Sequence, residues 1–186
     1  MSDVNILGLK VGAEQMQSLN PLLIMLFVPV FTLWIYPRMG KFAAPLKRMS
    51  YGLFLAAAAF VLIALLEKHL EAGAHLSILW QTWPYVVVTA AEVLVSTTGL
   101  EFAFREAAPE MKSLIMSFWL LTVAAGNLFV ALLTRFLPHT NSAAEDASVS
   151  SGRFLLYAGM MFAVAVVFSL IAATYNYRDQ AAAKGR

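Results

Sequence analysis

The sequence predicts an all-α integral membrane protein with five transmembrane helices. Of the 186 residues, 60% are hydrophobic and only 13% are charged, which is a more apolar composition than that of ordinary soluble domains. Five apolar segments are each long enough for a helix to cross the hydrocarbon core of a bilayer, which takes about 20 residues. The chain contains no cysteine, so disulfides, cysteine-ligated metals and thiol nucleophiles are excluded.

The first two apolar segments differ in character. The first is expected at about 18–37, where Asn20 and Pro21 can begin a helix and Pro29 should kink it or release a carbonyl group. The second is expected at about 49–66. Its interior has no ionisable side chain and is rich in alanine, which is typical of a scaffold helix.

The other three segments are expected at about 80–104, 111–136 and 154–175. Tryptophan and tyrosine occur where several of the five segments begin or end, including Tyr36 at the end of the first, as in the aromatic belts at membrane interfaces. The third segment differs from the others because an acid, Glu92, lies near its centre, about 18 Å of helix from either end. The expected organisation is an extracytoplasmic segment at 1–17, a five-helix membrane domain at 18–177 and a cytoplasmic tail at 178–186.

The basic residues predict the orientation in the membrane. The loop between the first two segments carries four basic residues and no acid, and more basic residues lie in the loop after the third segment and in the tail. Such stretches face the cytoplasm, so the C-terminus is expected inside a bacterial-type inner (plasma) membrane and the N-terminus outside. An external N-terminus is unusual for a complete protein, so we expect a fragment. The basic residues are Arg38, Lys41, Lys47, Arg48, Arg105, Lys112, Arg178, Lys184 and Arg186.

Glu92 is the main indication of a functional site. A charge at bilayer depth costs at least ~2.5 kcal/mol on insertion scales, so an acid there is a functional candidate by default. Burial favours the protonated acid and a nearby cation favours the carboxylate, so this group could exchange between two states, as a proton-coupled transporter requires. The alternative is a protonated acid that only joins neighbouring helices. The stripe of polar or small residues at helical spacing is Tyr85, Thr89, Glu92, Ser96, Gly99 and Ala103.

Three other candidates have simpler alternatives. Ser96 could bind a ligand or bond the carbonyl of its own preceding turn. Trp119 lies several residues inside the fourth segment, and it could equally be a lipid-facing or core aromatic. Asn20 could simply cap the first helix. The histidines fall in expected loops without metal-site spacing, and no motif indicates an enzyme or a nucleic-acid-binding protein. The three histidines are His69, His75 and His139.

Two stretches carry a family resemblance. QSLNPLLIMLFVP at 17–29 and WPYVVVTAAEVLVSTTGLEFAFREAAPEMKSLIMSFWLL at 83–121 closely resemble the C-terminal half of the proton-dependent oligopeptide transporter family, within the major facilitator superfamily. The specific part is E-V-L-x-S-x-x-G-L, followed by A-P-x-x-M-K-S and a downstream Trp and G-N. The resemblance implies that the five segments correspond to helices eight to twelve of a twelve-helix transporter, an incomplete C-terminal bundle.

The resemblance also implies roles for individual residues. Glu92 matches a glutamate of the peptide site near the amino end of the ligand, and Ser96 lies one turn along from it. Trp119 matches an aromatic residue that helps form side-chain pockets, and Asn20 matches a polar contact to the peptide backbone. The expected substrate-binding residues are therefore Glu92, Ser96, Trp119 and Asn20.

The implied function is that of a C-terminal fragment of a proton-coupled di-/tripeptide transporter. The family's first-helix E-x-x-E-R motif, fourth-helix lysine and seventh-helix site residues have no counterpart here, so the chain is expected to be inactive alone. Its expected partners are membrane lipid, the missing N-terminal half and, once completed by it, di- or tripeptides. Protons are the expected coupling ion, with no cofactor, metal or nucleic acid. The alternative is a small non-transporting membrane module that assembles with itself or with a half-transporter.

Overall fold

A computed structural model describes residues 4–6, 9–11, 18–40, 44–73, 78–136 and 151–175. Within these ranges, five helical spans are long and apolar enough to cross a membrane, as predicted. The chain divides into two compact units, one of residues 1–99 and 149–186 and one of residues 100–148. Each unit is described by itself below.

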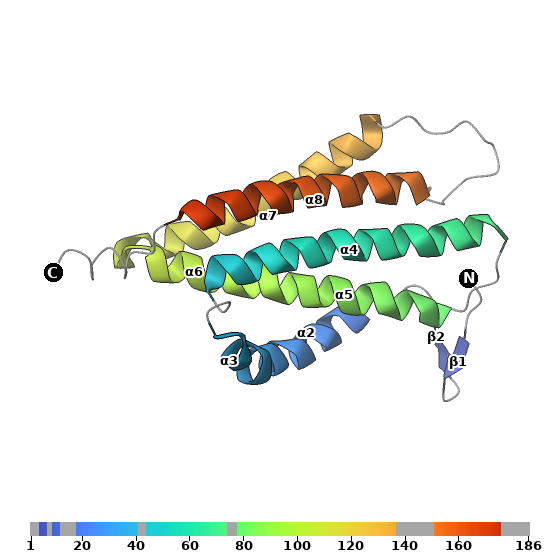
Figure 1. The fold of residues 1–186 in the computed structure, drawn as a ribbon, viewed down its shortest axis with the longest axis horizontal. Helices are drawn as coiled ribbons and strands as arrows, with labels where there is room; N and C mark the ends of the chain where they lie inside the picture. The colour runs from blue at the N-terminus through green and yellow to red at the C-terminus, as the bar shows by residue number, and fades with distance from the viewer. Residues whose placement is uncertain are drawn as a thin grey trace. The chain divides into compact units, whose positions relative to one another are not determined.

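The elements follow one another along the chain as in Figure 1. Two short strands, β1 (Val4–Ile6) and β2 (Leu9–Val11), pair as an antiparallel hairpin that the sequence did not predict. The first span consists of α2 (Leu19–Val30), a π-helical segment at Phe31–Ile35 and α3 (Tyr36–Met39). The second span is α4 (Pro45–Glu71). The third consists of a 3-10 turn (Ile78–Gln81), α5 (Thr82–Glu92), a second π-helical segment (Val93–Thr97) and α6 (Thr98–Glu106). A further 3-10 turn (Pro109–Met111), α7 (Lys112–Phe136) and α8 (Ser151–Thr174) complete the order.

Helix α4 extends beyond the apolar span expected at about 49–66. It begins at Pro45, because proline fixes a helical φ and its missing N–H is harmless in the first turn. It continues to Glu71, so the charged residues that follow the apolar run are also helical. Gly73 then adopts a φ of 82°, which glycine tolerates and other residues rarely do. His69, expected in a loop, therefore lies in the last turn of α4, while His75 and His139 lie outside the described residues.

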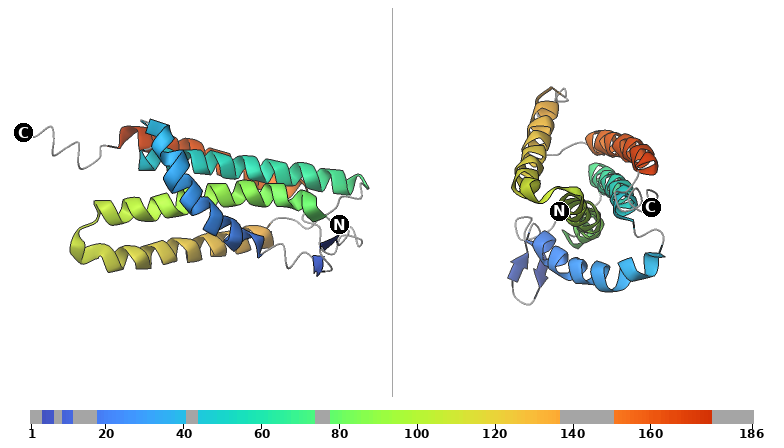
Figure 2. Two further views of the ribbon diagram at one scale, coloured as in Figure 1. Left: turned by 90° about the horizontal axis from the view of Figure 1, so that it is seen from below. Right: turned by 90° about the vertical axis from the view of Figure 1, so that its left-hand side faces the viewer.

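Helix α4 is the centre of the first unit and packs against both α8 and α5 (Figures 1 and 2). Its contact with α8 is built largely from alanine, and Ala59 of α4 and Ala165 of α8 have no exposed surface. Small residues let helix backbones approach closely in a membrane, where lipid gives no hydrophobic drive to association. Two aromatic pairs also join α4 to α8, Phe54 with Phe162 and Phe60 with Tyr157, with ring centroids 5.6 and 6.2 Å apart.

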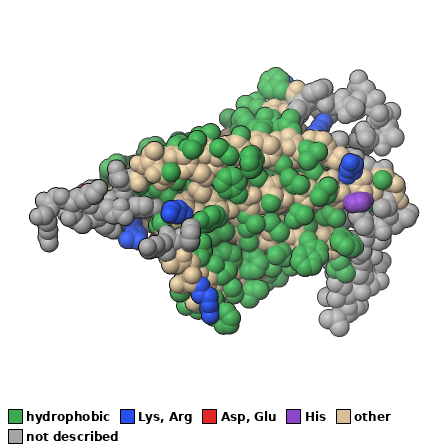
Figure 3. Space-filling view, viewed as in Figure 1, with side chains coloured by type: hydrophobic (Ala, Val, Ile, Leu, Met, Phe, Trp, Pro, Cys, Tyr) green, Lys and Arg blue, Asp and Glu red, His purple; other side chains and the backbone are tan. Residues whose placement is uncertain are grey.

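Many large hydrophobic side chains are exposed on the spans. In the first span, Met25 is 75% exposed, and Leu33 is 68% exposed. Figure 3 shows hydrophobic side chains covering most of the visible face, with the Lys and Arg side chains near its ends. This distribution suits surfaces that face lipid or further helices rather than water.

Gly52 permits the close approach of α4 to the π-helical segment Val93–Thr97. A Cβ atom at Gly52 would lie 2.7 Å from Val95 Cγ2, 2.9 Å from Leu94 Cβ and 3.1 Å from the Ala91 carbonyl oxygen. Two of these atoms belong to or adjoin the backbone and cannot rotate away. Glycine at this position therefore sets the distance between α4 and the third span.

We predict that Gly52→Ala lowers the stability of the chain in detergent by about 1–3 kcal/mol, the usual cost of overpacking a tight contact. Gly159→Ala on α8 is the matched control, because a Cβ there meets nothing within 4 Å. Thermal unfolding followed by circular dichroism measures both variants. Equal unfolding temperatures for the two variants would show that the close approach at Gly52 does not require a glycine.

Candidate functional site

Asn20 and Glu92 are hydrogen-bonded to each other across two spans. The amide nitrogen of Asn20, on α2, donates to Glu92 Oε2 at 3.2 Å. Thr89 Oγ1, one turn before Glu92 on α5, donates to Asn20 Oδ1 at 2.5 Å. Thr89 and Glu92 share a helical face, so a single side chain from α2 can reach both. The structure thus brings together two of the four predicted site residues and adds Thr89 to them.

The geometry of α2 argues against the simpler interpretation of Asn20 as a helix cap. Ser18 occupies the N-cap position, and Asn20 is the second residue of the helix. The Asn20 side chain makes its hydrogen bonds to Thr89 and Glu92 of another helix. Asn20 therefore links two helices rather than terminating its own.

Glu92 is the last α-helical residue before the π-helical segment Val93–Thr97, which contains Ser96. A π-helix bonds residue i to i+5 rather than i+4, so α-helical spacing does not carry over from Glu92 to Ser96. The backbone-bonding serine or threonine of this segment is Thr97, whose hydroxyl donates to the Val93 carbonyl at 2.5 Å. Single π-helical turns occur frequently at functional sites. The binding role of Ser96 stays a prediction.

A similar π-helical segment interrupts the first span after Pro29. Proline lacks an N–H, so it cannot bond the carbonyl four residues earlier, and a kink or released carbonyl was expected here. The π-helical residues are Phe31–Ile35, and the Thr32 hydroxyl donates to the Val28 carbonyl at 2.7 Å. Local π geometry and hydroxyl bonds of this kind satisfy backbone groups near a proline inside a membrane helix.

The two π-helical segments lead to a contact between Tyr36 and Thr98. These residues directly follow the two segments, and their hydroxyl oxygens lie 3.4 Å apart. The Arg48 guanidinium lies over the Tyr36 ring, 3.8 Å from its centroid. The sequence indicated Tyr36 only as part of an aromatic belt and Arg48 only as a loop charge. The extension of α4 back to Pro45 places Arg48 in its first turn and explains the difference.

A cavity of about 380 Å³ lies between α4, α5 and α8, and Tyr85 forms part of its wall. Tyr85 belonged to the predicted polar stripe, but it lines this cavity, whereas Thr89 and Glu92 bond to α2. Residues of the predicted stripe therefore face two different places: Tyr85 faces the cavity beside α4 and α8, and Thr89 and Glu92 face α2. Other lining residues are Phe60, Leu66, Glu67, Gln81, Val88 and Phe154.

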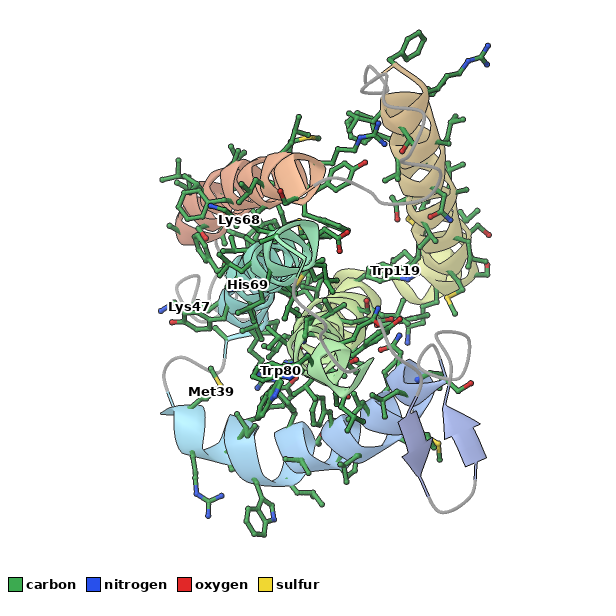
Figure 4. The ribbon with its side chains drawn as sticks, turned by 90° about the vertical axis from the view of Figure 1, so that its right-hand side faces the viewer. Met39, Lys47, Lys68, His69, Trp80 and Trp119 are labelled. Atoms are coloured by element: carbon green, nitrogen blue, oxygen red, sulfur yellow. The ribbon has the colours of Figure 1, made fainter. Side chains whose placement is uncertain are left out.

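Trp119 lies on α7 in the second unit, where Figure 4 labels it. The Thr122 hydroxyl donates to the Trp119 carbonyl at 2.7 Å, so the backbone bonding around Trp119 is local. The side-chain pocket assigned to Trp119 stays a prediction. Among the described residues, no group of three His, Asp or Glu side chains is arranged to hold a metal ion.

The comparison with protein families decides the affiliation. The model of the POT family matches residues 2–151, most of the chain. The chain belongs to the POT family. The resemblance inferred from the sequence motifs is therefore confirmed, together with the all-α membrane fold.

Named relatives of this POT chain are transporters. It is 42% identical over 104 residues to peptide transporter family 1 of Drosophila melanogaster, and 44% identical over 114 residues to peptide transporter family 1 of Caenorhabditis elegans. Solute carrier family 15 member 2 of Danio rerio is 41% identical over 101 residues. These matches cover 56%, 60% and 54% of the chain, but only 13% of each relative.

Two solved structures share the fold. The crystal structure of an auto-inhibited POT family peptide transporter superposes with a TM-score of 0.81 and 35% identity, over 90% of this chain and 34% of that one. The crystal structure of a second proton-dependent oligopeptide (POT) family transporter superposes with a TM-score of 0.63 and 35% sequence identity. The match covers 82% of this chain and 32% of that one. The chain thus spans about a third of the solved transporters that it matches.

We predict that Tyr36→Leu destabilises the chain more than Tyr36→Phe does. Leucine removes the ring beneath Arg48, a contact worth about 0.5–2 kcal/mol, while phenylalanine keeps the ring and loses only the long hydroxyl contact to Thr98. Trp34→Leu is the control, since the Trp34 ring is 67% exposed and lies 5.5 Å from the Arg38 guanidinium. Thermal unfolding in detergent ranks the three, and an equal loss for the Phe and Leu variants would contradict the prediction.

Proposed function

We propose that this chain forms the C-terminal part of a proton-coupled di-/tripeptide transporter and contributes one side of its peptide site. The observation that carries the proposal is the Asn20–Glu92 hydrogen bond, which joins two spans of a POT family chain at a polar point among apolar helices. The names of the relatives, which are peptide transporters, support peptide as the substrate class. Because the chain spans only part of each relative, we propose that it needs N-terminal helices to transport.

The proposed roles follow from the chemistry of the side chains. Glu92 would receive the ammonium group of a peptide, since charge-assisted hydrogen bonds to carboxylates are among the strongest that proteins make. The Asn20 amide offers both a donor and an acceptor, which suits the backbone of a peptide of any sequence. Ser96 and Trp119 would contact the ligand beyond Glu92, with Trp119 forming part of a side-chain pocket.

Proton coupling would depend on competition at Glu92. In the part of the chain that the structure describes, Glu92 bonds to the neutral amide of Asn20. A neutral partner leaves the carboxylate able to accept either a proton or an external cation. The peptide ammonium and a basic residue of the N-terminal helices are the proposed cations. Proton uptake and cation release would then be linked at one side chain, without a cofactor.

We further propose that the C-terminus lies in the cytoplasm, in a bacterial-type inner (plasma) membrane. The support is the charge where the first span ends and the second begins: Arg38 lies in α3, Lys41 follows it in the sequence, and Lys47 and Arg48 lie in the first turn of α4, without an acid among them. Short loops rich in Lys and Arg stay on the cytoplasmic side. The named relatives come from eukaryotes and the loop charges concern orientation alone, so the bacterial type of membrane is a proposal without support from either.

A chimera tests the proposed function. Residues 19–174 replace the matching third of the auto-inhibited POT transporter, and cells expressing the chimera are assayed for uptake of a labelled dipeptide. We expect uptake that an uncoupler abolishes, and uptake at background level from cells that express this chain alone. A chimera that inserts, as its fluorescence on size-exclusion chromatography reports, yet neither binds nor transports dipeptide would refute the assigned site. Robust uptake by the chain alone would refute the need for N-terminal helices.

Glu92→Gln separates coupling from folding in the same chimera. Glutamine keeps a carbonyl oxygen to accept the Asn20 bond but cannot carry a proton or a negative charge at membrane depth. We expect normal insertion, loss of proton-driven uptake and weaker dipeptide binding. Glu101→Gln, an exposed acid on α6, is the control and should retain uptake. Unchanged proton-driven uptake in Glu92→Gln would count against the coupling role of Glu92.

A further inference from the structure

We propose that Thr89 is a positioning residue that fixes the orientation of the Asn20 amide, so that its nitrogen faces Glu92. The motivating observation is the two-bond chain from Thr89 Oγ1 to Asn20 Oδ1 and from Asn20 Nδ2 to Glu92 Oε2. The consequence for transport rests on the proposed function, while the positioning itself rests on geometry alone. Thr89 is not among the residues that the family resemblance suggested for the site.

The first step concerns the two ends of the asparagine amide. Rotation by 180° about the terminal bond exchanges the oxygen acceptor with the NH₂ donor, and either orientation fits the same space. An ionised carboxylate can only accept, so the amide oxygen beside Glu92 would leave both groups without a donor. An ionised Glu92 therefore favours one orientation, and a second hydrogen bond at the amide oxygen can reinforce it.

The second step concerns the bond that Thr89 makes. Intramembrane threonine hydroxyls commonly bond the carbonyl of their own preceding turn. Thr32, Thr97 and Thr134 do so here, each donating to the carbonyl four residues earlier. Thr89 instead donates to the side chain of another helix, 69 residues away in sequence. The Thr89 hydroxyl therefore forms a hydrogen bond that joins α5 to α2, instead of one within α5.

The third step concerns burial. Thr89 has no exposed surface and Asn20 is half-buried, so the packing around Thr89 holds its hydroxyl in place as the donor to Asn20 Oδ1. A methyl group in the same place would leave the amide oxygen without this donor, so that Glu92 alone would favour the nitrogen-facing orientation. Thr89 therefore strengthens the orientation in which Asn20 presents its nitrogen to Glu92.

The direct test uses the chain itself in detergent micelles with ¹⁵N-labelled asparagine. The Asn20 side-chain NH₂ signal is assigned by its loss in Asn20→Ser, and its nuclear Overhauser contacts report the amide orientation. In the unsubstituted chain, we expect contacts from the NH₂ protons to the Glu92 methylene groups. Contacts to the Thr89 side chain in place of Glu92 would overturn the proposal without the need for any variant.

Matched variants then isolate the hydroxyl. Thr89→Val keeps the volume and removes the donor, so the contacts to Glu92 should weaken or disappear. Thr89→Ser keeps the donor and should restore them. Thr98→Val is the control, because Thr98 is equally buried on the same span but bonds Tyr36. Unchanged contacts in Thr89→Val would overturn the proposal, and circular dichroism confirms that each variant is folded. If Thr89→Val does not fold, the contacts in the unsubstituted chain and in Thr89→Ser decide.

The functional consequence is measured in the transport chimera. Thr89→Val should raise the KM for dipeptide about fivefold, the worth of one net hydrogen bond, with little change in kcat, and Thr89→Ser should restore the KM. A chimera without any uptake would count against the proposed function, while the spectra would still decide the role of Thr89. An active chimera in which Thr89→Val leaves KM unchanged would overturn its role in peptide binding.

Discussion

The structure of the first unit is organised by the hydrogen bond between Asn20 and Glu92. Glu92 is exposed on an apolar span, and in a membrane such an acid benefits from a polar partner, because an unpaired charge at bilayer depth is costly. The partner comes from the first span, 72 residues earlier, so the two helices must meet at this level. Thr89 completes the arrangement by bonding the other end of the same amide. These two hydrogen bonds join α2 to α5 at the level of Glu92.

Within the first unit, α4 and α8 support this contact without taking part in it. Alanine contacts draw α4 against α8, and Gly52 lets α4 lie close to the segment that follows Glu92. Both spans that contribute to the contact contain a π-helical segment, and both segments end at the Tyr36–Thr98 pair. The π-helical turns lie between two fixed points, the Asn20–Glu92 bond and the Tyr36–Thr98 contact. An apolar scaffold therefore supports two locally irregular helices that carry the polar groups.

The sequence was sufficient for features that depend on local pattern. Apolar length predicted the five spans and Pro29 predicted a local disturbance, while the functional role of the isolated acid, Glu92, stays a prediction. Features that depend on distant residues were not predictable in this way. No spacing rule connects Asn20 to Glu92, so Asn20 could equally be a helix cap until the structure joined them. The face shared by Glu92 and Ser96 assumed α-helical geometry, which the π-helical segment does not follow. Tyr36 was indicated only as a belt residue because its contact with Arg48 depends on where α4 begins.

The neutral character of the Asn20 amide limits what this part of the protein can do by itself. An amide donor holds a carboxylate in position but does not cancel its charge, so in the transporter that we propose the exposed Glu92 retains a demand for one further partner. A proton can meet that demand, and so can an ammonium or guanidinium group supplied from outside the described residues. These two solutions exclude each other, because a protonated acid gains little from a cation. An acid held by a neutral, oriented amide is therefore suited to exchange one for the other, whereas an acid already paired with a cation on its own helices would not be.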